Sequence, residues 1–212
     1  MKRRRRPAAL LGAILTVVLH WSCGNRHVNA DQSQEITRLA EVMRWKVGTI
    51  VADVGAGDGS YSFVAAEKVG VSGRVYATEI DKEKLKSLRT EVAKRKLDNV
   101  VVVEGTADDT KLPSDCCDAI FLRHVYHHLT QPQEFDLNLV RSLKPGGRLA
   151  IIEFPPGDRS EPVEGVPKNR GGHGIPEKVM VEELTSAGLQ VEKVVDDWSG
   201  KDYCVVFMKR GQ

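Results

Sequence analysis

The stretch Thr49-Ile-Val-Ala-Asp-Val-Gly-Ala-Gly-Asp-Gly-Ser60 organises the rest of the chain. Residues 49–54 are apolar except for Thr49 and Asp53, which is typical of a buried strand, and the glycines that follow lead into a helix expected to begin near Ser60. Glycine can adopt positive φ and lets the backbone approach a bound molecule, while the start of a helix offers unpaired N–H groups. The stretch therefore predicts a ligand site at a strand–turn–helix junction.

The spacing of the three glycines narrows the kind of ligand. Gly55, Gly57 and Gly59 follow a G-x-G-x-G pattern and not the G-x-G-x-x-G of a dinucleotide fingerprint. Asp53 stands near the carboxyl end of the expected strand, where its charge would repel a pyrophosphate. An acidic residue at this place favours a ligand that carries positive charge.

Composition and charge set the class of protein. The chain has 212 residues, of which 41% are hydrophobic and 28% charged, as expected for one soluble globular domain. Six of the 31 basic residues and none of the 29 acidic residues lie in residues 1–30, so the remaining chain is acidic overall. Because nucleic-acid binding normally needs a basic face, we expect no nucleic-acid partner.

Residues 1–30 have the features of a targeting segment. A basic stretch, Lys2–Arg6, precedes an apolar run, Ala8–Leu19, and the small-residue pattern Val28-Asn-Ala30 suits cleavage. The apolar run is shorter than the roughly 20 residues of a membrane span. We expect residues 1–30 to be a signal peptide or membrane-targeting segment, with residues 31–212 forming one domain that is exported or membrane-associated.

The cysteines bear on metal binding and on how residues 1–30 are processed. There are four, Cys23, Cys116, Cys117 and Cys204, with no C-x-x-C pattern and no histidine spacing that suits zinc, so we expect no metal site. Cys116 and Cys117 are adjacent and are expected to be free thiols. Cys23 is an alternative site of lipid attachment, and an arginine-rich organelle presequence is a further alternative for the same segment.

Alternating strand and helix patterns predict the architecture. We expect a helix after Asp31 and a Rossmann-like α/β fold, with a seven-stranded, mostly parallel sheet, an antiparallel last strand and helices on both faces. The expected strands are Thr49–Val54, Arg74–Thr78, Asn99–Glu104, Cys117–Arg123, Arg148–Phe154, Leu189–Val195 and Tyr203–Lys209, and the later helices are Ser60–Val69, Lys82–Lys94, Gln131–Leu143 and Pro176–Ala187. The long segment Pro155–Ile175 has no periodic apolar pattern and is expected to be a functional or disordered loop.

The acidic residue and three glycines of the first turn resemble motif I of the class I S-adenosylmethionine-dependent methyltransferases, and the order of elements extends this resemblance over residues 35–209. The resemblance implies S-adenosyl-L-methionine as cosubstrate. The cofactor-binding residues that it implies are Asp53, Gly55, Ala56, Gly57, Gly59, Glu79, Ile80, Thr106, Asp108 and Arg123.

The sequence around Glu79 and Thr106 gives further information about their expected roles. Glu79 ends the second expected strand, so its carboxylate faces the same crevice as the glycine turn and suits both hydroxyls of a ribose. The helix cap that follows is better assigned to Asp81. Thr106 occupies the position at which many family members have an adenine-binding aspartate, and Asp108 or Asp109 is the alternative adenine contact.

The candidate catalytic residues follow the fourth expected strand. They are His124, Tyr126 and His127, within the cluster His124-Val-Tyr-His-His128. A neutral histidine accepts a proton near neutral pH, which methyl transfer requires only when the acceptor must lose a proton. The alternative is that these side chains cap the strand and anchor the next helix. His173, in the long loop, is a candidate for closing over the site, with incidental placement on the surface as the alternative.

The expected function is S-adenosylmethionine-dependent methylation of a small-molecule acceptor by in-line displacement. A non-catalytic binding protein of the same fold is the first alternative, and a nicotinamide-dependent oxidoreductase is the second. The sequence sets neither the acceptor nor the oligomeric state.

Overall fold

The computed structural model describes residues 30–157 and 161–211. The predicted targeting segment, residues 1–30, lies outside this part of the chain except for its last residue. Among the described residues, no helix combines the length and the apolar character that crossing a membrane requires.

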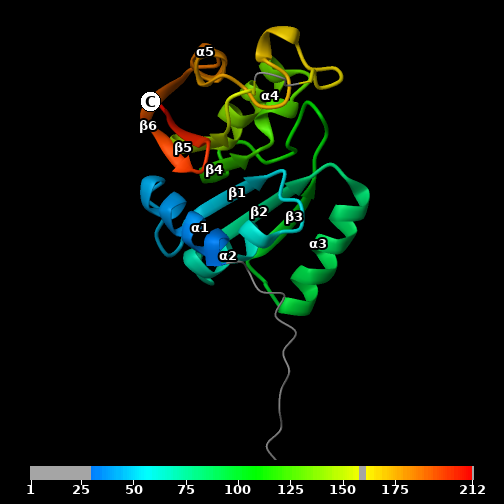
Figure 1. Cartoon of the computed structure of the whole chain (residues 1–212). Coiled ribbons are helices and arrows are strands. Elements are labelled where there is room, and N and C mark those ends of the chain that lie inside the picture. Colours follow the sequence, from blue (N-terminus) through cyan, green and yellow to red (C-terminus); the bar gives the residue numbers. More distant parts are fainter. Residues whose placement is uncertain (1–29, 158–160, 212) are drawn as a thin grey trace, which may run out of the picture.

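The chain folds around one seven-stranded sheet with the strand order β3-β2-β1-β4-β5-β7-β6 (Figure 1). The strands are β1 (Ile50–Val54), β2 (Arg74–Glu79), β3 (Val100–Glu104), β4 (Cys117–Arg123), β5 (Leu143–Glu153), β6 (Leu189–Ser199) and β7 (Asp202–Lys209). The neighbours from β3 to β5 pair in parallel, and β7 runs antiparallel to both β5 and β6. This is the predicted class I methyltransferase fold.

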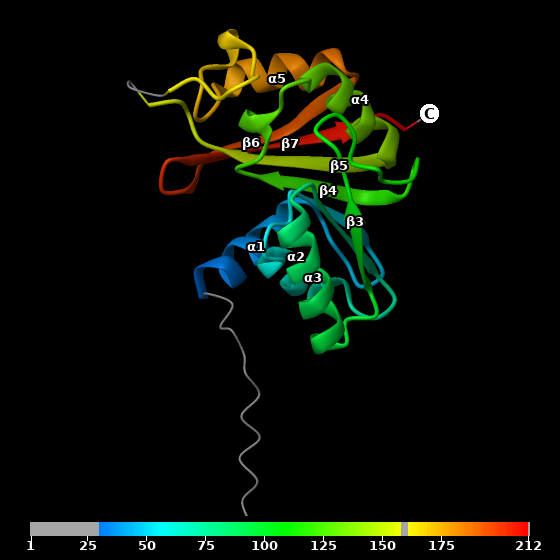
Figure 2. The same cartoon turned by 90° about the vertical axis from the view of Figure 1, so that its right-hand side faces the viewer.

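Helices cover both faces of the sheet, as predicted (Figure 2). They are α1 (Ala30–Val42), α2 (Ser60–Val69), α3 (Lys82–Arg95), α4 (Pro132–Ser142) and α5 (Glu177–Ser186). Successive strand residues point to opposite faces and so enter two separate cores. Val51 packs in the core that α1, α2 and α3 cover, whereas its neighbour Ala52 packs in the core under α4 and α5.

Two strand boundaries differ from the sequence-based expectation by more than one residue. β5 begins at Leu143 because Leu143 already pairs with Cys117, and the register then shifts at the glycine turn before Arg148 pairs with Ala119. β6 continues to Ser199 through an irregular pairing with β7. Trp198 consequently lies within the strand, where it is buried and packs against α1 instead of standing in a loop.

The long segment after β5 is fastened to the domain by Arg170, which lies in a short 3₁₀ turn, η2 (Lys168–Arg170). The Arg170 side chain is buried and donates hydrogen bonds to the backbone carbonyls of Tyr126 and Leu129 and to the carboxylate of Glu183 on α5. A buried guanidinium is tolerated only with such partners. The described part of this segment is therefore an integral piece of the fold.

Candidate functional site

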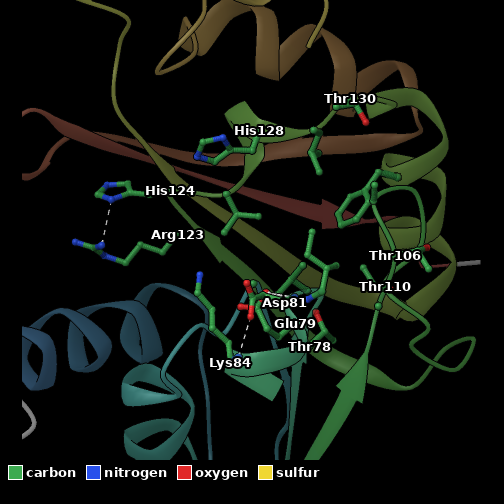
Figure 3. A pocket seen from close by; sticks show the side chains of 18 residues that line it. Thr78, Glu79, Asp81, Lys84, Thr106, Thr110, Arg123, His124, His128 and Thr130 are labelled. Carbon is green, nitrogen blue, oxygen red and sulfur yellow. Dashed lines mark hydrogen bonds between the residues drawn. The ribbon is translucent and has the colours of Figure 1, made fainter. Parts of the chain in front are cut away.

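A pocket of about 750 Å³ opens at the carboxyl ends of β1, β2 and β4. The chain turns outward from β1 to β2 and later returns to place β4 on the other side of β1, so the loops after β1 and β4 diverge here. In open α/β sheets ligands bind at such a switch point. Figure 3 places Arg123, His124 and His128 at one end of the pocket and Thr106 and Thr110 at the other, with Glu79 and Asp81 below.

Glu79 is fixed at the base of the pocket by backbone amides. One carboxylate oxygen accepts from Gly57 N at 2.9 Å, and the other accepts from Ile80 N at 2.8 Å and Asp81 N at 3.0 Å. The side chain is only 6% exposed, yet it lines the pocket. An ionised carboxylate has about four acceptor positions, so capacity remains for a ligand hydroxyl. Asp81 accepts from the amides of Glu83 and Lys84, which is the expected helix cap.

The glycine turn leaves room for a ligand at one point and packs tightly at another. A Cβ at Gly57 would meet only one atom, the carbonyl oxygen of Gly55 at 4.0 Å, so its outer side is open. A Cβ at Gly55 would lie 2.5 Å from the Val125 side chain, because the loop after β4 rests on this turn. Both glycines have positive φ, which explains why the turn needs them. Ala56 and Gly59 are buried within the turn and do not line the pocket.

Asp53 lies behind the glycine turn. Its carboxylate is 4% exposed and accepts a 2.6 Å hydrogen bond from the Ser62 hydroxyl on α2. Burial raises the pKa of Asp53 to about 7, the Ser62 hydrogen bond opposes this, and the nearby charges of Glu79 and Asp58 add to it. Positive charge on a bound ligand would favour the ionised form. A cationic ligand in the pocket would therefore stabilise the ionised Asp53, although Asp53 itself does not line the pocket.

The loop after β3 forms the far end of the pocket. Thr106 lines this end together with Thr110, and Ile80 contributes an apolar side chain that is 59% exposed. Asp108 does not line the pocket, and its carboxylate accepts from the Thr106 hydroxyl at 2.7 Å. This end of the pocket is therefore lined by Ile80 and the two threonines.

Arg123 connects the pocket to α1 through Glu35. Its Nε donates to both Glu35 oxygens at 3.0 and 3.1 Å, and Glu35 also accepts from Tyr61 and Trp198. Burial by itself would raise the pKa of Glu35, but these hydrogen bonds and the Arg123 charge hold it below its usual value. Arg123 therefore stands at the pocket as part of a fixed ion pair.

Both ring nitrogens of His124 are engaged. Arg123 Nη1 lies 3.2 Å from His124 Nδ1, and Asp202 Oδ2 lies 2.7 Å from His124 Nε2. A guanidinium can only donate, so Nδ1 carries no proton and the Nε2 proton points at Asp202. His124 also holds a φ of 54°, a strained value for a residue other than glycine. This arrangement suits a positioning role.

Tyr126 and His127 point away from the pocket. The Tyr126 side chain is fully buried, and its hydroxyl oxygen lies 2.9 Å from Asp136 Oδ2 and 3.0 Å from Glu183 Oε2. His127 is 1% exposed, with Nδ1 at 2.8 Å from the buried Glu153 carboxylate and Nε2 at 3.2 Å from His173 Nδ1. Neither residue lines the pocket, and each is held by partners from neighbouring elements.

The cluster's remaining histidine does reach the pocket. His128 is exposed and lines the wall above Glu79 (Figure 3). In residues 30–157 and 161–211, no hydrogen bond engages either of its ring nitrogens. Its ring lies 4.0 Å from the His127 ring, centroid to centroid, so His127 supports it from behind.

Comparisons with known proteins agree with this geometry. Residues 52–151 match a family model described as a methyltransferase domain. Residues 52–151 are thus similar to a methyltransferase domain, and the order of the strands is that of the class I fold. An S-adenosylmethionine-dependent methyltransferase from Aquifex aeolicus has a solved structure that is similar with a TM-score of 0.68 and 29% identity, covering 82% of this chain and 88% of that one.

Curated relatives match over the same domain. A demethylmenaquinone methyltransferase of Listeria monocytogenes serotype 4a is 30% identical over 113 residues, which are 53% of this chain and 48% of the relative. A probable cobalt-precorrin-6B C(15)-methyltransferase of Sulfurisphaera tokodaii is 36% identical over 105 residues, which are 49% of this chain and 53% of the relative. The chain therefore spans about half the length of these relatives. The family model, these relatives and the solved structure are all described as methyltransferases, so this chain is similar to proteins of that class.

The residues present fit S-adenosylmethionine as cosubstrate. The pocket joins a fixed carboxylate, the Gly55 end of the glycine turn and an apolar wall in one cavity, and its volume is within the ordinary range of ~300–1,000 Å³ for small-molecule sites. Sequence reasoning missed Glu35 and Glu153, which hold Arg123 and His127 across the fold. No local pattern marks either residue, because their partners lie far away in the sequence.

Proposed function

We propose that this protein transfers a methyl group from S-adenosylmethionine to a small-molecule acceptor. The observation that carries the proposal is the position of Glu79, whose buried carboxylate is held at the end of β2 by the glycine turn and faces the pocket. A ribose offers two adjacent hydroxyls to such a carboxylate. The relatives named above methylate small molecules according to their names, which supports the same acceptor class here.

In this proposal, residues at one end of the pocket bind the cosubstrate and residues at the other end position the acceptor. Glu79 holds the ribose, while Ile80 and Thr106 border the base. The bound cosubstrate supplies an electrophilic methyl group on a positively charged sulfur. Methyl transfer by in-line displacement depends mainly on alignment, and the paired Arg123 and His124 give the acceptor end a rigid wall.

Calorimetric titration of the full-length protein tests this proposal. S-adenosylmethionine and S-adenosylhomocysteine should bind, and NAD should not. Transfer of a radiolabelled methyl group to small-molecule acceptors should follow. Binding of NAD in place of the methyl donor would favour an oxidoreductase. Donor binding with no transfer to any acceptor would favour a non-catalytic binding protein of this fold.

We further propose that residues 1–30 direct export or membrane attachment, with residues 31–212 as the methyltransferase domain. The support is the order of basic, apolar and small residues in that segment. N-terminal sequencing and fractionation of the protein expressed with its full sequence test the proposal. An intact N-terminus on a protein found only in the soluble cell extract would contradict it.

A further inference from the structure

The three histidines of the cluster that follows β4 have different environments. His124 is held between Arg123 and Asp202, and His127 is held between Glu153 and His173. A ring nitrogen that already has a hydrogen-bond partner must break that bond before it can take a proton from a ligand. His128 has no such bond to break within the described residues, and its ring lies at the pocket wall. We propose that His128 is the general base that takes the proton from the methyl acceptor.

The buried pair behind His128 fixes its position. Glu153 is fully buried and accepts from the His127 backbone N–H at 3.2 Å as well as facing His127 Nδ1 at 2.8 Å. These contacts hold η1 (Tyr126–His128) against the end of β5, and the His127 ring in turn packs against the His128 ring. The His128 imidazole is therefore held in position through its neighbour and not by a carboxylate of its own among the described residues.

The surroundings of His128 favour its neutral form. Burial lowers the pKa of His128, the neighbouring His127 and His173 lower it further, and the Glu153 carboxylate partly opposes this. A neutral imidazole at pH 7 can accept a proton, but its modest basicity limits it to fairly acidic groups. The modest basicity of His128 therefore restricts the acceptor to one with an acidic proton.

The structure points to an acceptor with an acidic hydroxyl on an unsaturated ring, that is, a phenol or an enol. Val125, Leu129 and Phe135 line the pocket around His128 with apolar surface that suits a planar ring. Arg123 lies at the same end and favours the developing anion, whereas Glu79 and Asp81 lie below (Figure 3). An aliphatic alcohol is too weak an acid for this base.

In the proposed step, the O–H bond of the acceptor breaks, and its proton passes to a ring nitrogen of His128. The electron pair left on the acceptor oxygen, or on a ring carbon conjugated with it, forms a bond to the methyl carbon. The bond between that carbon and sulfur breaks, and its electron pair stays on sulfur. The His128 imidazolium then releases its proton to water. This inference rests on the proposed function, because it assigns the base for that same reaction.

Binding of 4-nitrocatechol provides a test that needs no turnover, because the absorbance of this phenol reports its ionisation. In the full-length protein with S-adenosylhomocysteine, we expect it to bind ionised at pH 6, where most of the free compound still carries its proton. Binding by the H128Q variant should be at least about tenfold weaker, since a glutamine cannot take the proton. The dimethyl ether of the same compound, which has no acidic hydroxyl, should bind both proteins equally.

Turnover and chemical rescue separate a base from a structural residue. Methyl transfer to 4-nitrocatechol by the H128A variant should fall on the order of 100-fold or more in kcat with donor affinity unchanged. Added imidazole should restore part of that rate, because the exposed position leaves a space that opens into the pocket. Rescue by imidazole would not occur if His128 only held the turn together.

The outcomes distinguish the two proposals. Normal donor binding with no binding of 4-nitrocatechol, or with equal binding of it by wild type and H128Q, would overturn the role of His128 and leave the proposed function standing. Undiminished turnover in H128A would do the same. Absence of S-adenosylmethionine binding would overturn the proposed function, and the role of His128 with it.

Discussion

Substituting Glu79 by glutamine should weaken donor binding while the protein remains folded. A charge-assisted hydrogen bond contributes roughly 1.5–3 kcal/mol, and each 1.4 kcal/mol is a factor of ten in affinity, so S-adenosylmethionine should bind roughly 10- to 150-fold more weakly. The glutamine carbonyl can still accept from Ile80 N and Asp81 N, whereas its NH₂ group would face Gly57 N–H. One lost acceptor of this kind costs about 1–3 kcal/mol of folding stability.

An alanine at the same position would be less informative. It would remove the acceptor of all three backbone amides and destabilise the glycine turn itself. The assay is therefore calorimetry of E79Q, with urea denaturation to show that the variant is folded. Glu104 pairs with Glu79 at the end of the adjacent strand but does not line the pocket, so E104Q is the matched control. Wild-type donor affinity in folded E79Q would refute the assignment of Glu79 to the ribose.

The remaining predictions concern stability and pH. Burial raises the pKa of Asp136 to about 7 from its ordinary value of 3.8, so ionisation disfavours the folded state, and wild-type stability should decline as pH rises from 4 to above 7. The D136N variant should not show the loss of stability that comes from this ionisation, which is on the order of 4 kcal/mol at pH 8. Urea denaturation at a series of pH values measures it. Parallel plots of stability against pH for D136N and wild type would contradict this prediction. R170M should lose about 3–5 kcal/mol of stability, because it removes the cation that pairs with Glu183 and the donor to the carbonyls of Tyr126 and Leu129. A loss no larger than that of K168M, an exposed control on the same turn, would count against the anchoring role. Because the pKa of Asp53 is raised to about 7, the affinity for S-adenosylmethionine should fall as pH drops through 7, and calorimetry of D53N should show a flat dependence; an equal slope in D53N would assign the titration to another group.

The sequence by itself determined the order of elements and the edge of the sheet at which the site lies. The glycine turn, the position of Glu79 at the end of a strand and the cap at Asp81 are all local patterns, in which residues act on neighbours a few positions away. The all-parallel run from β1 to β5 and the antiparallel β7 follow from the alternation of strand and helix patterns.

Only the tertiary structure decided which side chain of the cluster faces the pocket. The residues Tyr126, His127 and His128 form one 3₁₀ turn, in which successive side chains point about 120° apart. Tyr126 enters the core under α4 and α5, His127 contacts Glu153, and His128 lines the pocket. The partners that select this rotation, Arg170, Glu153 and Glu183, come from segments distant in the sequence, so no local pattern could have indicated it.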